Sequence, residues 1–159
     1  MNEADSLPDQ SRRPQKRAED FLNGGFGLVS VEEALTDGIV LLDVRTAEEF
    51  AEGSVPDALS RPLFDNMERA EIGTIYKQIG RYDAVEKGLE FFEPKIQQFL
   101  ESISDIKSQQ IVVFCARGGM RSSSVVRLLQ HHGFRVAQMQ GGYKTVSYTH
   151  LTLPTILLV

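Results

Sequence analysis

The segment VVFCARGGMRSSSVV, residues 112 to 126, holds the residues best suited to chemistry. An apolar run ends at Cys115, which is the one cysteine of the chain, and a loop rich in glycine and arginine follows it. The backbone N–H groups of a tight glycine-rich loop can point inward and bind an anion, and the positive end of a following helix strengthens that field. Such surroundings favour the thiolate of a cysteine over the neutral thiol. We therefore expect Cys115 to be a nucleophile.

The expected anion-binding loop consists of Ala116, Arg117, Gly118, Gly119, Met120 and Arg121. Arg121 heads the expected helix, which favours a structural or anion-binding role, whereas Arg117 can equally be a solvated surface charge. A second interpretation of Cys115 is a small apolar residue that ends a buried strand. That interpretation does not account for two glycines and two arginines in the next six positions.

Histidine does not accompany this cysteine. His131 and His132 fall at the far end of the helix expected after the loop, and His150 lies near the end of the chain. A cysteine–histidine protease pair is therefore not expected. One cysteine also excludes an intrachain disulfide, and no Cys/His spacing typical of a metal site occurs, so we expect no metal.

Helices and strands alternate along the part of the chain that must position Cys115. Capping boxes predict helices that begin after Ser30, Thr46, Asp65 and Asp83. Short apolar runs predict strands at 39–44, 111–114 and 135–139, and a further helix is expected at 122–132. Pro94 predicts a kink or two abutting helices.

Alternating strands and helices predict an α/β fold, a single domain with a parallel sheet and helices on both faces. Ligands of such sheets bind beyond the carboxyl ends of the strands. Asp43 and Arg45 end the first expected strand as Cys115 ends the second. We expect all three at one rim, with Asp43 and Arg45 as a buried scaffold pair rather than direct catalysts.

Composition narrows the class of protein. The chain has 159 residues, of which 42% are hydrophobic and 25% charged, as in an ordinary soluble domain. A net charge of -5 argues against a protein that wraps nucleic acid through an overall basic surface. This net charge does not exclude a local basic site. No apolar run reaches the roughly 20 residues of a membrane span, and the polar start shows no signal peptide. We expect a cytoplasmic protein without a membrane partner.

Two stretches, LLDVRTAEEFAEGSVPDAL and VVFCARGGMRS, resemble the rhodanese fold. The resemblance covers about residues 27 to 145 and implies that Cys115 carries a sulfur atom as a persulfide. Single-domain rhodaneses tend to read Cys-x-x-Gly-x-Arg-Ser, whereas Arg121 lies one position later here. This Cys-x5-Arg spacing is that of cysteine phosphatases, and the longer loop can hold a larger anion than one sulfur atom.

A second motif indicates which family of rhodanese-like proteins the chain resembles. ERAEIGTIYKQIG at 68–80, together with GGYK at 141–144, is similar to the N-terminal half of bacterial tRNA 2-selenouridine synthases. That family replaces the sulfur of wobble 2-thiouridine in tRNA with selenium from selenophosphate, and it also makes a geranylated intermediate. The resemblance implies that Cys115 is required for selenation, with tRNA and selenophosphate as partners and no tightly bound cofactor.

The insertion at 66–81 admits two interpretations. Its apolar residues keep helical spacing, so it can be a helix with one packed face. It can also supply Arg69, Tyr76, Lys77 and Arg81 as a lid or as contacts to RNA phosphates.

We expect three segments: a disordered lead-in at 1–20, a rhodanese-like domain at 21–145 and a non-native tail at 146–159. SYTHLTLPT in that tail resembles translated sequencing adapter. The resembled family continues past GGYK into a P-loop domain, and no Gly-x4-Gly-Lys motif occurs here. The expected protein is thus a fragment, in which geranyl transfer from geranyl diphosphate would need the missing domain. A cysteine phosphatase and a non-catalytic rhodanese-like binding domain remain the alternatives.

Overall fold

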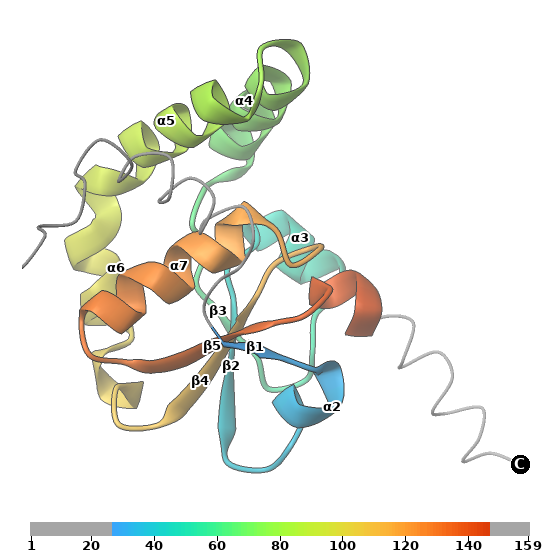
Figure 1. Ribbon diagram of the computed structural model, residues 1–159, viewed down its shortest axis with the longest axis vertical. Coiled ribbons are helices and arrows are strands. Elements are labelled where there is room, and N and C mark those ends of the chain that lie inside the picture. Colours follow the sequence, from blue (N-terminus) through green and yellow to red (C-terminus); the bar gives the residue numbers. More distant parts are fainter. Residues whose placement is uncertain (1–26, 147–159) are drawn as a thin grey trace, which may run out of the picture.

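A five-stranded parallel sheet organises the computed structural model, which describes residues 27–146. The expected lead-in and residues 147–159 of the expected tail lie outside the described residues. The strand order is β1-β5-β4-β2-β3, and every neighbouring pair is parallel. The strands are β1 (Leu28–Val29), β2 (Ile39–Asp43), β3 (Leu59–Ser60), β4 (Gln110–Phe114) and β5 (Arg135–Met139). The predicted α/β fold is confirmed (Figure 1).

Helices connect these strands. They are α2 (Val31–Ala34), α3 (Ala47–Glu52), α4 (Asn66–Gln78), α5 (Arg81–Phe92), α6 (Ile96–Ser102) and α7 (Met120–His131), with short 3₁₀ turns at Glu93–Lys95 and Ser104–Ile106. The 3₁₀ turn that contains Pro94 separates α5 from α6, which confirms the interruption expected from that proline. None of the described helices is long and apolar enough to cross a membrane.

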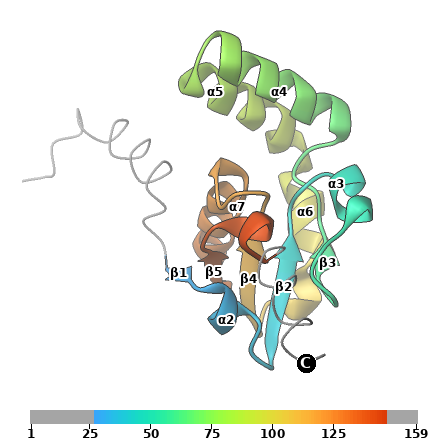
Figure 2. The same cartoon turned by 90° about the vertical axis from the view of Figure 1, so that its right-hand side faces the viewer.

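The side chains of the central strands point alternately to the two faces of the sheet, and both faces are buried. Ile111, Val113 and Cys115 belong to the core beneath α5, α6 and α7, whereas Val112 and Phe114 belong to the core beneath α2. Figure 2 shows α2 on one side of the sheet and α6 on the other. Cys115 thus continues the pleat of β4 and faces the larger core.

Two of the expected capping boxes are present, at Thr46 of α3 and Asp65 of α4. At Ser30 only the serine side chain bonds, accepting from the Glu33 amide. The expected start after Asp83 is wrong, because α5 begins at Arg81 with Gly80 as its N-cap. Gly80 has φ 147°, a value that glycine adopts readily. The chain therefore turns at Gly80, and the helix has already begun before Asp83 could act as its N-cap.

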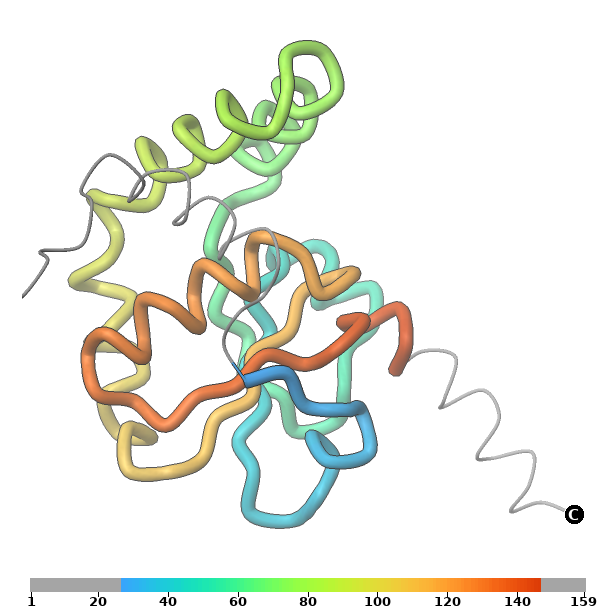
Figure 3. Tube along the Cα trace, viewed as in Figure 1, coloured from blue at the N-terminus to red at the C-terminus, as the bar shows by residue number. Residues whose placement is uncertain are grey.

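Helices α4 and α5 form an antiparallel hairpin that stands above the end of the sheet where α3 begins (Figures 1 and 3). Phe64 and Ile72 contact α5 at Gly88, where an added Cβ would lie 3.2 Å from the Phe64 ring. Lys95 also forms an ion pair with Glu68 of α4. The insertion therefore has one packed face, as the first of its two interpretations predicts.

Strands β1 and β3 are not predicted from the sequence, because they have two residues each and carry no periodicity. At the other end of the domain, Val146 was assigned to the tail. Its side chain is fully buried in the core beneath α2, and residues 142–146 are helical. The core thus extends one residue past the expected boundary.

Candidate functional site

Cys115 follows β4 directly and lies at the start of the loop that leads into α7. The residue is 3% exposed, and its Sγ lies 3.2 Å from Oγ of Ser122. Ser122 Oγ accepts a hydrogen bond from Gln138 Nε2 at 2.8 Å, and its proton can be donated either to the sulfur or to Gly119 O, which lies 3.2 Å away. Burial alone also fits the interpretation of Cys115 as a core residue. The directed contact with Ser122 is what that interpretation does not predict.

The loop after Cys115 presents backbone N–H groups without partners. Among the described residues, the amides of residues 116–122 donate to no backbone or side-chain acceptor. The Gln138 side chain instead binds the loop carbonyls, reaching Gly118 O at 3.0 Å and Gly119 O at 3.3 Å. Because the Gln138 side chain binds these two carbonyl oxygens, the backbone N–H groups of the loop remain available to bind an anion.

One part of the expected loop is helical. Met120 and Arg121 are the first two residues of α7, which begins two residues earlier than Ser122. The reason is that Gly119 is the N-cap and that Ser122 bonds back to Gly119 O rather than capping the helix itself. Free amides of this first turn extend the anion site of the loop.

The GGYK turn supports the loop from the other side. The amide of Tyr143 donates to Cys115 O at 2.8 Å, and the amide of Lys144 donates to Ala116 O at 3.0 Å. Gly142 has φ 64°, and an added Cβ would lie 2.5 Å from Cys115 O and 2.6 Å from Gly118 N. Only glycine fits at this contact, which explains why this motif accompanies the cysteine loop.

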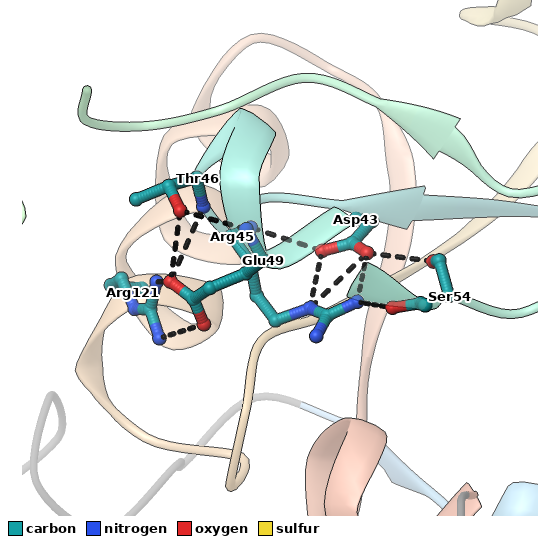
Figure 4. Close-up of polar contacts among 7 residues, drawn as sticks. Asp43, Arg45, Thr46, Glu49, Ser54 and Arg121 are labelled. Atoms are coloured by element: carbon teal, nitrogen blue, oxygen red, sulfur yellow. Dashed lines mark hydrogen bonds and ion pairs between the residues drawn. The ribbon is translucent and has the colours of Figure 1, made fainter. Parts of the chain in front are cut away.

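Arg121 turns toward α3 and forms two hydrogen bonds with Glu49, at 2.8 and 3.3 Å (Figure 4). Thr46 holds the same carboxylate through its amide and hydroxyl. Burial alone would raise the pKa of Glu49, but the hydrogen bonds and the charge of Arg121 lower it below its ordinary value. Arg121 therefore orders the site through an ion pair with an ionised carboxylate.

Asp43 and Arg45 form the buried scaffold pair that the sequence predicts. Their charged atoms are 2.8 Å apart, and Asp43 also accepts from Ser54 Oγ at 2.7 Å (Figure 4). Arg45 donates to Gly53 O at 2.7 Å and lies 4.1 Å from the ring centre of Tyr143. The pair thereby connects β2 and α3 to the GGYK turn.

Arg69 lies in the first turns of α4 and is half-buried. Burial and the nearby Arg121 lower the pKa of Arg69, whereas Glu49 and Cys115 act in the opposite direction. Tyr76 and Lys77 are exposed in the last turn of α4, and Tyr76 Oη accepts from Arg81 Nε at 3.3 Å. Arg117 is exposed as well. Of these residues, Arg69 is half-buried and its pKa responds to Arg121, Glu49 and Cys115, whereas Tyr76 and Lys77 are exposed in the last turn of α4.

Three residues at the site escaped the sequence analysis: Glu49, Ser122 and Gln138. Glu49 was recognised only as the partner of Thr46 in a capping box. Ser122 is the first serine after the loop arginine, which was its one available signal. Gln138 interrupts the apolar strand β5 and is 2% exposed, and a polar residue at a buried strand position requires a partner.

The assembled site can bind an anion next to a nucleophilic sulfur. It combines the Cys115 sulfur, backbone N–H groups that have no partner among the described residues, the N-terminal end of a twelve-residue helix, and the guanidinium groups of Arg121 and Arg69. Within residues 27–146, no group of three or more His, Cys, Asp or Glu side chains could hold a metal ion.

Comparison with known proteins agrees with this geometry. The family model "Rhodanese-like domain" matches residues 29–148. The chain is 36% identical over 113 residues to tRNA 2-selenouridine synthase of Cronobacter sakazakii, covering 69% of this chain and 30% of that protein. It is also 36% identical over 122 residues to the same enzyme of Proteus mirabilis, covering 74% of this chain and 33% of that protein. The chain thus spans about a third of the length of these relatives.

A solved structure resembles most of the chain. The N-terminal domain of a Clostridium difficile 630 protein described as ATP/GTP-binding superposes with a TM-score of 0.73 at 38% identity. The match covers 80% of this chain and 99% of that domain. The cysteine loop, the parallel sheet and the family match agree, and the chain belongs to the rhodanese-like domain family.

Proposed function

We propose that this domain carries sulfur or selenium on Cys115 and passes it to tRNA, as part of a tRNA 2-selenouridine synthase in the cytoplasm. The observation that carries this proposal is the Cys115 sulfur, which lies 3.2 Å from the Ser122 hydroxyl at the start of a loop whose backbone N–H groups have no partner among the described residues. The relatives named tRNA 2-selenouridine synthase support tRNA as the acceptor and selenium as the transferred element. Selenophosphate as the donor and 2-thiouridine as the acceptor base are part of the proposal.

Sulfur transfer from thiosulfate is the simplest reaction of such a site. The Cys115 thiolate attacks the outer sulfur of thiosulfate, a new S–S bond forms, and sulfite leaves with the electron pair of the broken S–S bond. The loop amides and the start of α7 stabilise the resulting persulfide anion. Cyanide then removes the outer sulfur as thiocyanate and regenerates the thiolate. The persulfide must pass to another molecule, because the chain has no second cysteine.

The site favours transfer over phosphate-ester hydrolysis. A cysteine phosphatase needs an acid that protonates the departing alcohol. Glu49 is the carboxylate on Arg121, but its lowered pKa keeps it ionised at neutral pH. It can therefore order the loop arginine but cannot supply the proton.

A thiocyanate assay tests the transfer reaction. With thiosulfate and cyanide, the wild-type chain should release thiocyanate, and the Cys115→Ser variant should release none above the uncatalysed rate. Equal rates for the two proteins would reject Cys115 as the carrier and leave a non-catalytic domain as the better account.

The end of the α4–α5 hairpin supports tRNA as the partner. The hairpin tip, defined as Tyr76, Lys77, Ile79, Arg81 and Tyr82, combines two cations with exposed apolar and aromatic side chains. Ile79 is 68% exposed and Tyr82 is 69% exposed. Aromatic rings stack on unpaired bases and cations contact phosphates, so the tip has the composition of an RNA contact.

The salt dependence of binding tests the hairpin tip. Replacing Lys77 and Arg81 together by alanine should weaken binding to tRNA and reduce the slope of log K against log salt by about 1 to 2. The matched control removes Lys107 and Arg135, two exposed cations at the other end of the sheet. Equal slopes for both double variants would remove the tip from the RNA contact.

A further inference from the structure

Lys144 and Arg117 are exposed cations whose backbones meet at the cysteine loop. The amide of Lys144 donates to Ala116 O at 3.0 Å, which places the Lys144 backbone beside the residue that follows Cys115. An added Cβ at Gly142 would lie 2.8 Å from the amide nitrogen of Arg117, so the two segments are in contact there as well. Two cations from segments far apart in the sequence are thus anchored at the same short stretch of loop.

Neither of these cations has a partner that would account for it. Among the described residues, the side chains of Lys144 and Arg117 form no ion pair. Arg121 differs, because two hydrogen bonds join it to Glu49. The chain has a net charge of -5, so two uncompensated cations beside the nucleophile are a local exception to the overall charge. This local basic site suits a charged group that arrives from solvent.

The burial of Cys115 indicates which charged group that is. Cys115 is 3% exposed and belongs to the larger core, so an acceptor base can approach its sulfur only from the side of the loop. Enzymes that act on a base take it out of its stack, and the phosphates next to that base remain outside the pocket. Proteins contact such phosphates with lysine and arginine side chains. The backbone N–H groups of the loop suit the small anion of the donor, which leaves the exposed cations for the acceptor.

We propose that Lys144 and Arg117 bind the RNA phosphates on either side of the acceptor base and so position that base over Cys115. The inference rests on the proposed function, because it assigns RNA contacts to the site at which transfer takes place. The α4–α5 hairpin stands over the same end of the sheet, so one RNA molecule can contact both its tip and the loop (Figure 2). The hairpin tip contributes affinity, whereas the two loop cations align the reacting nucleotide.

Protection of Cys115 from alkylation tests this contact without any transfer reaction. Iodoacetamide is uncharged, so salt does not act on it directly, and its reaction with Cys115 slows when RNA covers the loop. The probe is an RNA stem-loop that carries one 2-thiouridine in its loop, titrated at several salt concentrations. The RNA should protect the wild-type chain in a saturable manner, and the titration gives its dissociation constant.

Replacing Lys144 and Arg117 together by glutamine should raise this dissociation constant by about tenfold at low salt. The slope of log K against log salt should fall by about 1.4, which is about 0.7 for each lost phosphate contact to a single strand. Glutamine retains the backbone amide that donates to Ala116 O, so the fold should persist. Lys144→Arg combined with Arg117→Lys keeps both charges and should retain the wild-type slope. Replacing Lys107 and Arg135 by glutamine removes two exposed cations at the other end of the sheet and should match the wild type.

An unchanged slope in the glutamine variant, or the absence of protection in the wild type, overturns the proposal. A reduced slope in the variant that keeps both charges also overturns it, because the effect would then come from structure and not from charge. If the double glutamine variant unfolds, Lys144→Gln alone decides, with an expected change in slope of about 0.7.

Sulfate, titrated at constant ionic strength, is the second probe and stands for the anion of the donor. Should the glutamine substitutions weaken protection by sulfate as much as protection by RNA, the two cations belong to the donor site, and the RNA contact is rejected. Failure of the proposed function is seen separately, as the absence of a sulfur adduct on Cys115 in the presence of thiosulfate. Either result can occur without the other.

Discussion

At the scale of single residues, we expect the reactivity of Cys115 to depend on the contact between its sulfur and the Ser122 hydroxyl. Gln138 donates to the Ser122 hydroxyl at 2.8 Å, and the hydroxyl lies 3.2 Å from the sulfur. The hydroxyl is thus held beside the sulfur, with the sulfur and the Gly119 carbonyl oxygen, each 3.2 Å away, as the two possible acceptors of its proton. This placement makes Ser122 a positioning residue whose loss should leave the fold intact.

We predict that Ser122→Ala slows thiocyanate formation by about tenfold, which corresponds to the loss of one hydrogen bond of about 1.4 kcal/mol. Ser124→Ala is the matched control, because Ser124 Oγ donates to Met120 O at 2.6 Å and has no contact with the sulfur. The account of Ser122 is wrong if both variants show the same rate as the wild type.

The Glu49–Arg121 pair makes stability depend on pH. The pKa of Glu49 is lower in the folded chain than its ordinary value, so the ionised form stabilises the fold. This contribution is present above the ordinary pKa of glutamate and is lost as the pH falls through the lowered folded value. The side chain of Glu49 is 28% exposed, so solvent screens the pair and keeps its contribution small.

Glu49→Gln should lower the free energy of unfolding by about 1 kcal/mol at pH 7, and the difference from the wild type should shrink as the pH falls below the ordinary pKa of glutamate and vanish below the lowered folded value. Urea unfolding at a series of pH values measures both effects. Glu48→Gln changes an exposed neighbour on α3 and should show neither. A difference that persists unchanged into acid would mean that the Glu49 charge does not matter.

At the scale of elements, the GGYK turn and the cysteine loop form one unit. Gly142 contacts the backbone of the loop so closely that an added Cβ would lie 2.5 Å from Cys115 O. Its φ of 64° adds a second obstacle to any larger residue. The turn therefore sets the shape of the loop from a segment far away in the sequence.

Gly142→Ala should destabilise the fold by about 2–3 kcal/mol and abolish thiocyanate formation, because the loop must move to admit the methyl group. Gly38→Ala is the control: Gly38 has φ 85°, and an added Cβ there meets nothing within 4 Å. It should cost about 1 kcal/mol and leave the reaction unchanged. Equal effects of the two substitutions would show that only backbone strain, and not the contact with the loop, matters at Gly142.

Elements with strong local signals could be predicted from the sequence, and contacts between distant segments could not. The capping boxes at Thr46 and Asp65 predict α3 and α4, and the apolar runs predict β2, β4 and β5. The start of α5 was misplaced because the glycine turn before it outweighed the Asp83 signal.

Within the site, the loop and the Asp43–Arg45 pair were predictable because they are local in sequence. The pairing of Arg121 with Glu49 spans 72 positions, and that of Ser122 with Gln138 spans 16. Neither residue type nor spacing indicates such partners. The sequence names Arg69 together with Tyr76 and Lys77, and only the structure shows that Arg69 is half-buried while the other two are exposed at the hairpin tip.

At the scale of the whole molecule, the chain matches the rhodanese-like domain over residues 29–148 and spans about a third of the length of its curated relatives. The described part of the chain holds Cys115, the loop with backbone N–H groups that lack partners among the described residues, and the insertion hairpin. We therefore expect Cys115 to accept a sulfur atom without any other segment of those longer proteins. Turnover on tRNA should be weak in this chain alone, since the relatives carry out that reaction with further sequence.

The mass of the intact chain after exposure to thiosulfate tests the central claim most directly, with p-nitrophenyl phosphate as the competing reagent. A persulfide adds one sulfur atom, whereas a phosphatase intermediate adds a phosphoryl group to the same cysteine. We predict one added sulfur atom per wild-type chain, none in Cys115→Ser, removal of the atom by cyanide and no phosphoryl adduct. A phosphoryl adduct on Cys115 with rapid release of p-nitrophenol, and no sulfur adduct, would contradict the account and make the chain a phosphatase.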